Sequence, residues 1–157
     1  MRLKTFLEQR GADGGPWNNL CALPALWVGL LYDDTALNAA LDLVKDWTAE
    51  ERVALRLGAA HCGEQREAGN VGVAHCGLKT PFRNATMQDL AKEVLAIARS
   101  GLKARARLNH HGEHEAVFLD DLDEIAASGI TPAERLLALY NGPWGGSVEP
   151  IFKEAAY

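Results

Sequence analysis

Two histidine–cysteine pairs are the side chains of this sequence best suited to binding a metal ion. His61 and Cys62 are followed fourteen residues later by His75 and Cys76, in matching Ala-His-Cys-Gly contexts. Two histidines and two cysteines are ligands that a tetrahedral zinc site uses. Adjacent ligands differ from the usual zinc spacing, because neighbouring side chains in an extended chain point apart. An inserted loop over residues 58–77 and a disulfide between the two cysteines are the alternatives.

Charged residues near the start of the chain lie in a segment that alternates like a β-strand. Over residues 2–10, Leu3, Thr5 and Leu7 alternate with a second set of residues, and this period of two predicts one strand. The second set includes Glu8 and Arg10, which are two residues apart and therefore project from the same face. A strand that presents polar chemistry is one interpretation. On pattern alone, an exposed edge strand with solvated charges is the commoner explanation.

Other ionisable residues are explained by exposure to solvent. His110, His111 and His114 occur in a polar turn, and we expect all three at the surface. Lys103 and Arg105 come at the end of a predicted helix, where positive charge suits the helix dipole. None of these residues is assigned a catalytic role.

The composition indicates one folded domain. The chain has 157 residues, of which 48% are hydrophobic and 24% charged, and its formal net charge is -5. This balance allows a sizeable core and argues against a general electrostatic attraction to nucleic acid. No apolar run is long enough to span a bilayer, and charges interrupt the region where a signal peptide needs its apolar core. We therefore expect a cytoplasmic protein with reduced thiols that binds neither nucleic acid nor membrane.

The remaining sequence predicts a series of helices whose starts are marked by capping residues. Residues 17–32 are apolar almost throughout and predict a buried helix, with Pro24 marking a kink or a start. Capping patterns at residues 48–51, 86–89 and 131–134 predict the beginnings of three more helices. The expected architecture is one strand followed by helices.

The sequence also predicts where one helix ends, a further helix at the surface, and which side of the last long helix is buried. The helix that begins after residue 48 is expected to end at Leu57, before the inserted loop. Residues 117–128 mix acidic and apolar side chains and predict an amphipathic surface helix. The helix that begins after residue 131 carries four large apolar residues, which we expect to form its buried side: Leu136, Leu137, Leu139 and Tyr140.

Two segments are long enough to act as family signatures. They are residues 6–17, FLEQRGADGGPW, and residues 141–150, NGPWGGSVEP. Residues 20–33 and 129–134 also fit the same family. In this order and spacing, the segments resemble glutamate–cysteine ligase of the plant and proteobacterial type, over nearly the whole chain.

The resemblance implies that residues 1–157 are the carboxy-terminal portion of a larger catalytic domain. The full enzyme would have a glutamine-synthetase-like α+β core, of which this piece is mostly α-helical with one amino-terminal strand. The implied reaction joins the γ-carboxylate of glutamate to the amine of cysteine, using ATP and Mg²⁺, as the first step of glutathione biosynthesis. By the same resemblance, Glu8 is a magnesium ligand and Arg10 contacts the phosphate or acyl phosphate.

The resemblance also bears on whether the chain works alone. An enzyme of this family would take most of its metal, nucleotide and amino-acid contacts from an upstream portion, so we expect the isolated chain to be inactive or to need a complementary upstream polypeptide. Two other classes of function stay open. One is a non-catalytic helical interaction module, and the other is a zinc-binding interaction protein built on the two histidine–cysteine pairs.

Overall fold

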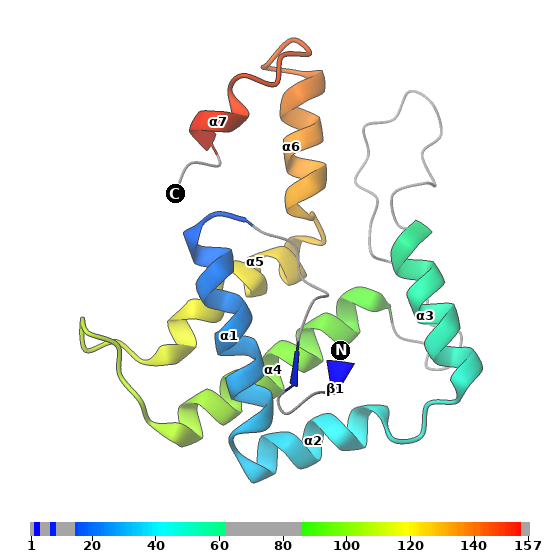
Figure 1. Cartoon of the computed structure of the whole chain (residues 1–157), viewed down its shortest axis with the longest axis vertical. Coiled ribbons are helices and arrows are strands. Elements are labelled where there is room, and N and C mark those ends of the chain that lie inside the picture. The colour runs from blue at the N-terminus through cyan, green and yellow to red at the C-terminus, as the bar shows by residue number, and fades with distance from the viewer. Residues whose placement is uncertain (1, 4–6, 9–14, 62–85, 155–157) are drawn as a thin grey trace.

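The described part of the protein is mostly helical. The computed structural model describes residues 2–3, 7–8, 15–61 and 86–154 (Figure 1). In chain order the elements are β1 (Arg2–Leu3), β2 (Leu7–Glu8), α1 (Trp17–Leu31), α2 (Asp34–Val44), α3 (Ala49–His61), α4 (Met87–Arg105), the 3-10 helix η1 (Glu115–Leu119), α5 (Asp120–Ser128), α6 (Pro132–Asn141) and α7 (Ile151–Glu154).

Helices α1 and α4 cross at a backbone contact that leaves no room for side chains. A Cβ atom added at Gly101 would lie 1.9 Å from the carbonyl oxygen of Gly29, and one added at Gly29 would lie 2.2 Å from that of Ala98. Bonded geometry and van der Waals radii forbid such approaches, so both glycines are required for the helices to meet this closely. Figure 1 shows this crossing at the centre of the helical core.

The core is completed where η1 and α5 pack against the crossed pair. Leu102 of α4 and Leu119 of η1 are the largest fully buried side chains, with exposed fractions of 1% and 0%. Burying a leucine of this kind contributes about 2 kcal/mol through the hydrophobic effect. The buried cluster consists of Ala25, Leu30, Leu95, Ala98, Leu102, Ala116, Leu119 and Ala126.

The predicted helix starts are confirmed. Thr86 caps α4, where the Asp89 amide donates to the threonine hydroxyl oxygen (3.1 Å) and the Thr86 amide donates to the aspartate carboxylate (2.7 Å). Thr131 and Glu134 form the same reciprocal box at α6. The predicted helix over 17–32 is α1, although Pro24 lies inside it and so does not mark its start.

The single strand predicted over residues 2–10 is not confirmed. β1 and β2 pair antiparallel, with Arg2 opposite Glu8 and Leu3 opposite Leu7. These two parts of the segment therefore run in opposite directions. An alternating pattern specifies extended backbone but is equally compatible with a hairpin, because a strand and its return share the same period.

Helix α3 is longer than predicted and enters the expected inserted loop. It continues through His61, four residues past Leu57. Gly58 is a common helix end, but Ala59 and Ala60 favour helical backbone and no proline follows before His61, so the helix continues past the glycine. Residues 62–77, the rest of the expected loop, lie outside the described residues.

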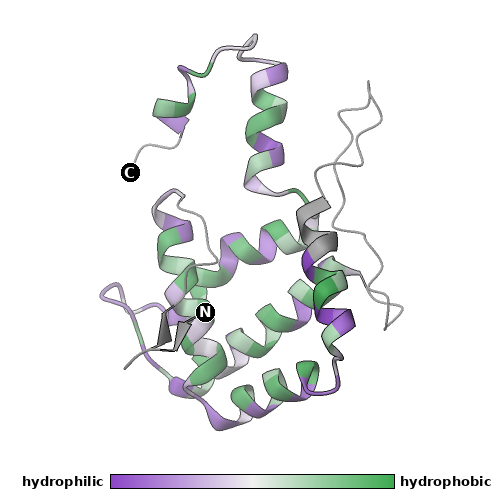
Figure 2. Ribbon diagram, turned by 45° about the vertical axis from the view of Figure 1, so that its right-hand side comes forward, coloured by the Kyte–Doolittle hydropathy of each residue, from purple (hydrophilic) through white to green (hydrophobic). Residues whose placement is uncertain are grey.

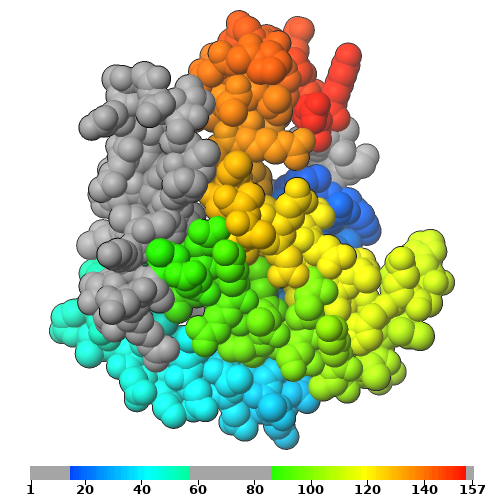
Figure 3. Space-filling view, turned by 180° about the vertical axis from the view of Figure 1, so that it is seen from behind, coloured from blue at the N-terminus to red at the C-terminus, as the bar shows by residue number. Residues whose placement is uncertain are grey.

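The expectation that α6 has a buried side is wrong for this chain. No residue of α6 or α7 is buried. Figures 1 and 3 show both helices projecting from one end of the helical core. A stripe of apolar residues shows which side of a helix would be buried, but full burial also needs enough packing partners; in the described residues Leu136, Leu137 and Leu139 are only half-buried and Tyr140 is exposed.

The amphipathic helix predicted over 117–128 is confirmed as α5 preceded by the 3-10 turn η1.

No single described helix is long and apolar enough to cross a membrane. Helices α1 and α2 pass that test together, by length and composition only, with a bend of 92° between them.

Candidate functional site

Of the two residues with the clearest implied chemistry, the structure describes only Glu8, in the strand β2. Glu8 is the last residue of β2, and pairing with Arg2 fixes the position of its backbone. Arg10 lies outside the described residues. The roles of Glu8 as a magnesium ligand and of Arg10 as a phosphate contact therefore stay predictions.

The histidine–cysteine pairs are also largely outside the described part of the chain. His61 is the last residue of α3, whereas Cys62, His75 and Cys76 fall in the undescribed segment. Within the described ranges, no group of three or more histidine, cysteine, aspartate or glutamate side chains is placed to hold a metal ion. The zinc and disulfide hypotheses both stay untested.

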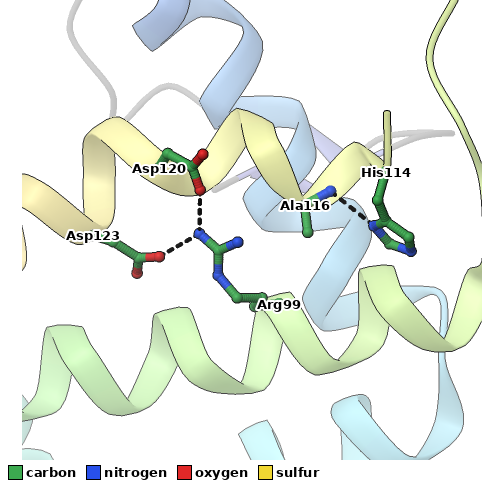
Figure 4. A network of polar contacts seen from close by, with 5 residues as sticks. All are labelled: Arg99, His114, Ala116, Asp120 and Asp123. Atoms are coloured by element: carbon green, nitrogen blue, oxygen red, sulfur yellow. Dashed lines mark hydrogen bonds and ion pairs between the residues drawn. The ribbon is translucent and has the colours of Figure 1, made fainter. Parts of the chain in front are cut away.

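One network of polar side chains lies between α4 and α5 (Figure 4). The Arg99 guanidinium on α4 donates to Asp120 (2.8 Å) and also to Asp123, both on α5. Desolvation by partial burial lowers the pKa of Arg99, but hydrogen bonds to the two aspartates outweigh it and leave this pKa raised. Because two carboxylates already neutralise the guanidinium, it is better suited to fastening α5 to α4 than to receiving an anionic substrate.

A second tie joins the same helices at their other end. The Gln88 side-chain amide donates to the carbonyl oxygens of Ala126 (2.8 Å) and Ala127 (3.0 Å). These carbonyls belong to the last turn of α5, where no intrahelical partner exists. Gly129 follows with φ of +71°, and its backbone conformation ends the helix. Gln88 therefore caps α5 from α4.

His114 is a structural residue that sequence reasoning assigned to the surface. Its Nδ1 atom accepts a hydrogen bond from the Ala116 amide (3.1 Å), which caps η1 (Figure 4). The side chain is half-buried, whereas His110 and His111 are exposed as expected. The position of His114 two residues before the first free amide of η1 is the signal that could have identified this cap.

The second signature segment forms the turn that ends α6. Gly145 and Gly146 adopt positive φ values of 55° and 80°. The Gly146 amide donates to the carbonyl of Tyr140 (2.8 Å), and the Trp144 amide donates to that of Leu139 (2.9 Å). Glycine adopts this left-handed backbone without steric cost. The glycines of the signature are thus explained by the geometry that leads the chain from α6 to α7.

Comparison with known proteins shows what the whole chain is similar to. Residues 1–154 match the model of glutamate-cysteine ligase family 2 (GCS2). The chain is 51% identical over all its 157 residues to a chloroplastic glutamate–cysteine ligase of Arabidopsis thaliana. It is 47% identical over the same length to that of Nicotiana tabacum and 48% identical to glutamate–cysteine ligase A of Oryza sativa subsp. indica.

These matches cover all of this chain but only part of each relative. All of this chain is covered, but it spans only 26% of the Arabidopsis and Nicotiana proteins and 28% of the rice protein. The names of these relatives place them in the chloroplast, which gives no support to the cytoplasmic expectation. Because the family model matches nearly every residue, the chain belongs to glutamate-cysteine ligase family 2.

Proposed function

We propose that this chain supplies part of the machinery of a glutamate–cysteine ligase, which forms γ-glutamylcysteine in glutathione biosynthesis. The observation that carries the proposal is the 51% identity to a ligase across the whole chain. The match covers both the strands with Glu8 and the helices. The chain spans about a quarter of that relative, so the complete activity requires residues beyond those of this chain.

The proposed chemistry uses ATP to activate glutamate. The γ-carboxylate oxygen attacks the terminal phosphorus of ATP, which releases ADP and leaves γ-glutamyl phosphate. The amine of cysteine then attacks the acyl carbon, and phosphate departs as the amide bond forms. Phosphoryl transfer of this kind depends on positioning and on neutralising the charge of the phosphate oxygens.

Glu8 and Arg10 have side-chain chemistry that fits these needs. Mg²⁺ is usually held by one or two carboxylates, with phosphate oxygens and water completing its octahedron. A glutamate is such a ligand, and a guanidinium binds phosphate oxygens through two parallel hydrogen bonds. The described residues contain no cluster of three or more acidic or histidine ligands. Any further protein ligand for the metal would therefore come from the rest of the enzyme or from residues outside the described ranges.

A chimera tests this function. The matching quarter of the Arabidopsis ligase would be replaced by residues 1–157, and γ-glutamylcysteine formation would be measured together with ADP release. We expect product that depends on glutamate, cysteine and ATP. Glu8→Ala should lower magnesium-dependent turnover by at least about tenfold, because it removes a metal ligand.

The matched control is Glu124→Ala, which removes an exposed carboxylate from α5. It should leave turnover within about twofold of the parent chimera, since surface substitutions cost little. A folded chimera that makes no γ-glutamylcysteine would overturn the proposed function. Equal turnover in Glu8→Ala and the parent would remove only Glu8 from the site.

A further inference from the structure

The helical arm formed by α6 and α7 has apolar residues of which none is fully buried: Leu136, Leu137 and Leu139 are half-buried, and Tyr140, Val148 and Phe152 are exposed. We define the arm face as the residues Leu136, Leu137, Leu139, Tyr140, Val148 and Phe152. Phe152 is 76% exposed and Val148 is 62% exposed. Figure 2 shows apolar residues along α6 although the helix stands apart from the core.

Helix α6 of the arm has local signals for helix formation in spite of this exposure. Thr131 and Glu134 form its capping box, with the Thr131 amide donating to the glutamate carboxylate at 2.7 Å. An ion pair of 3.7 Å joins Arg135 on α6 to Glu154 on α7. A ten-residue helix is nevertheless marginal in water without packing, and an exposed ion pair adds little stability. The local signals alone therefore do not make the arm stable.

The apolar residues of α6 also share one side of the helix. Leu136, Leu137 and Tyr140 follow the i, i+1, i+4 spacing, and Leu139 flanks them. Ala138 lies about 200° from Leu136 around the helix and is exposed. The arm thus has an apolar side that could be buried and a polar side that suits solvent.

We propose that the arm face docks on the remainder of a ligase polypeptide, the part of the enzyme that this chain does not span. This inference rests on the proposed function. Two observations identify the occupant: the family match runs through α6 and α7 to residue 154, and the chain accounts for only 26% of the Arabidopsis relative. The arm therefore belongs to the body of an enzyme most of which lies outside this chain.

The lack of any buried residue distinguishes the arm from α1 and α2. These two helices also expose apolar side chains such as Leu31 and Leu41, but each of them buries other residues in the core. In the arm no residue is buried. The arm therefore differs from α1 and α2 in having no buried residue of its own to hold it in place.

Hydrogen exchange of the α6 amides tests the docking directly. It would be measured by mass spectrometry in the isolated chain and in the Arabidopsis chimera, with Leu136→Lys and Ala138→Lys in each. Both variants add the same charge to the same helix, and lysine is a good helix former. We expect α6 to be protected at least about tenfold more in the chimera than in the isolated chain.

The two variants should differ in how much they lower the hydrogen-exchange protection of α6. Leu136→Lys should remove at least about tenfold of that protection in the chimera, because it places a charge in the buried interface, whereas Ala138→Lys should change it less than about threefold. Equal protection in the chimera and the isolated chain would overturn the docking. Equal effects of the two variants would also overturn it, as would concentration-dependent protection of the isolated chain, which identifies a second copy as the occupant.

ADP release that depends on cysteine, measured on the same samples, keeps the two proposals apart. Protection of α6 in a chimera without turnover supports the docking and overturns the proposed function. Turnover in a chimera whose α6 is unprotected supports the function and overturns the docking. A parent chimera that does not fold contradicts the docking, since residues 1–157 would then fail to pack on the rest of the ligase.

Discussion

The two helices with the clearest capping boxes have different fates in this protein. Helix α4 begins at the Thr86–Asp89 box and buries Leu95 and Leu102 against the rest of the core. Helix α6 begins at the Thr131–Glu134 box and has no fully buried residue. Both have an amphipathic pattern, so the difference does not come from local sequence.

The contrast separates what makes a helix from what makes a core. Capping satisfies the amide groups at a helix start, and spacing puts apolar residues on one side. Burial needs a second surface, which α1, η1 and α5 supply for α4. In the arm that surface is absent from the described chain, and we assign it to the rest of the enzyme.

Truncating a leucine in each region should give the largest difference. Leu102→Ala should lower the free energy of unfolding by about 3 kcal/mol, because it leaves a cavity among fully buried neighbours. Leu136→Ala should cost less than about 1 kcal/mol in the isolated chain. Urea unfolding followed by circular dichroism measures both, and equal losses would mean that the arm is part of the folded core.

Glycine substitutions sharpen the comparison, since the two regions use glycine for different reasons. Gly101→Ala should cost about 2 kcal/mol or more, because its Cβ would meet the backbone of Gly29 and force α1 and α4 apart. Gly145→Ala has open space around the added Cβ and pays only for its positive φ, about 1 kcal/mol. Thermal unfolding should rank them in this order, and the reverse order would refute the close helix crossing.

Removing each cap should show which helix unfolds with the core. Thr86→Ala and Thr131→Ala each remove a helix cap that contributes about 1 kcal/mol. The first should lower global stability in the isolated chain, whereas the second should only speed hydrogen exchange within α6. A global loss from Thr131→Ala as large as that from Thr86→Ala would contradict the independence of the arm.

Acid should expose the smallest effect, at the cap of α4. The hydrogen bond from the Thr86 amide, and then that from its hydroxyl, lowers the pKa of Asp89. A carboxylate with a depressed folded pKa stabilises the fold above its unfolded pKa of about 4, and this contribution is lost as pH falls through the folded pKa. Asp89→Asn should therefore flatten the acid side of the stability curve, whereas Glu93→Gln on the same helix should not. Parallel curves for Asp89→Asn and the parent would count against the cap.

Sequence reasoning reached the helices because their signals are local. Each capping box spans four consecutive residues, and the apolar run of α1 is one continuous segment. The helices predicted from these signals are confirmed. The Arg99 tie to Asp120 and Asp123 was missed because its partners are more than twenty residues apart in the chain. The histidine cap was missed because a polar context predicts exposure as readily as capping.

The candidate site was less accessible to prediction than the fold. From sequence alone, the glycines at the crossing of α1 and α4 only lower helix propensity, and their role in close packing is visible only when the partner backbone is known. The pairing of Arg2 with Glu8 shows that an alternating segment can contain a reversal. The roles of Glu8 and Arg10 came only from family resemblance, because one carboxylate and one guanidinium do not identify a reaction.

ADP release in a mixture of two polypeptides is the most direct test that this chain is one part of a ligase. The 157-residue chain and the complementary portion of the Arabidopsis protein would be assayed separately and together, with glutamate, cysteine, ATP and Mg²⁺. We predict cysteine-dependent ADP release only when both polypeptides are present. Release by the 157-residue chain alone, at the rate of the mixture, would show a complete minimal ligase and contradict the divided site.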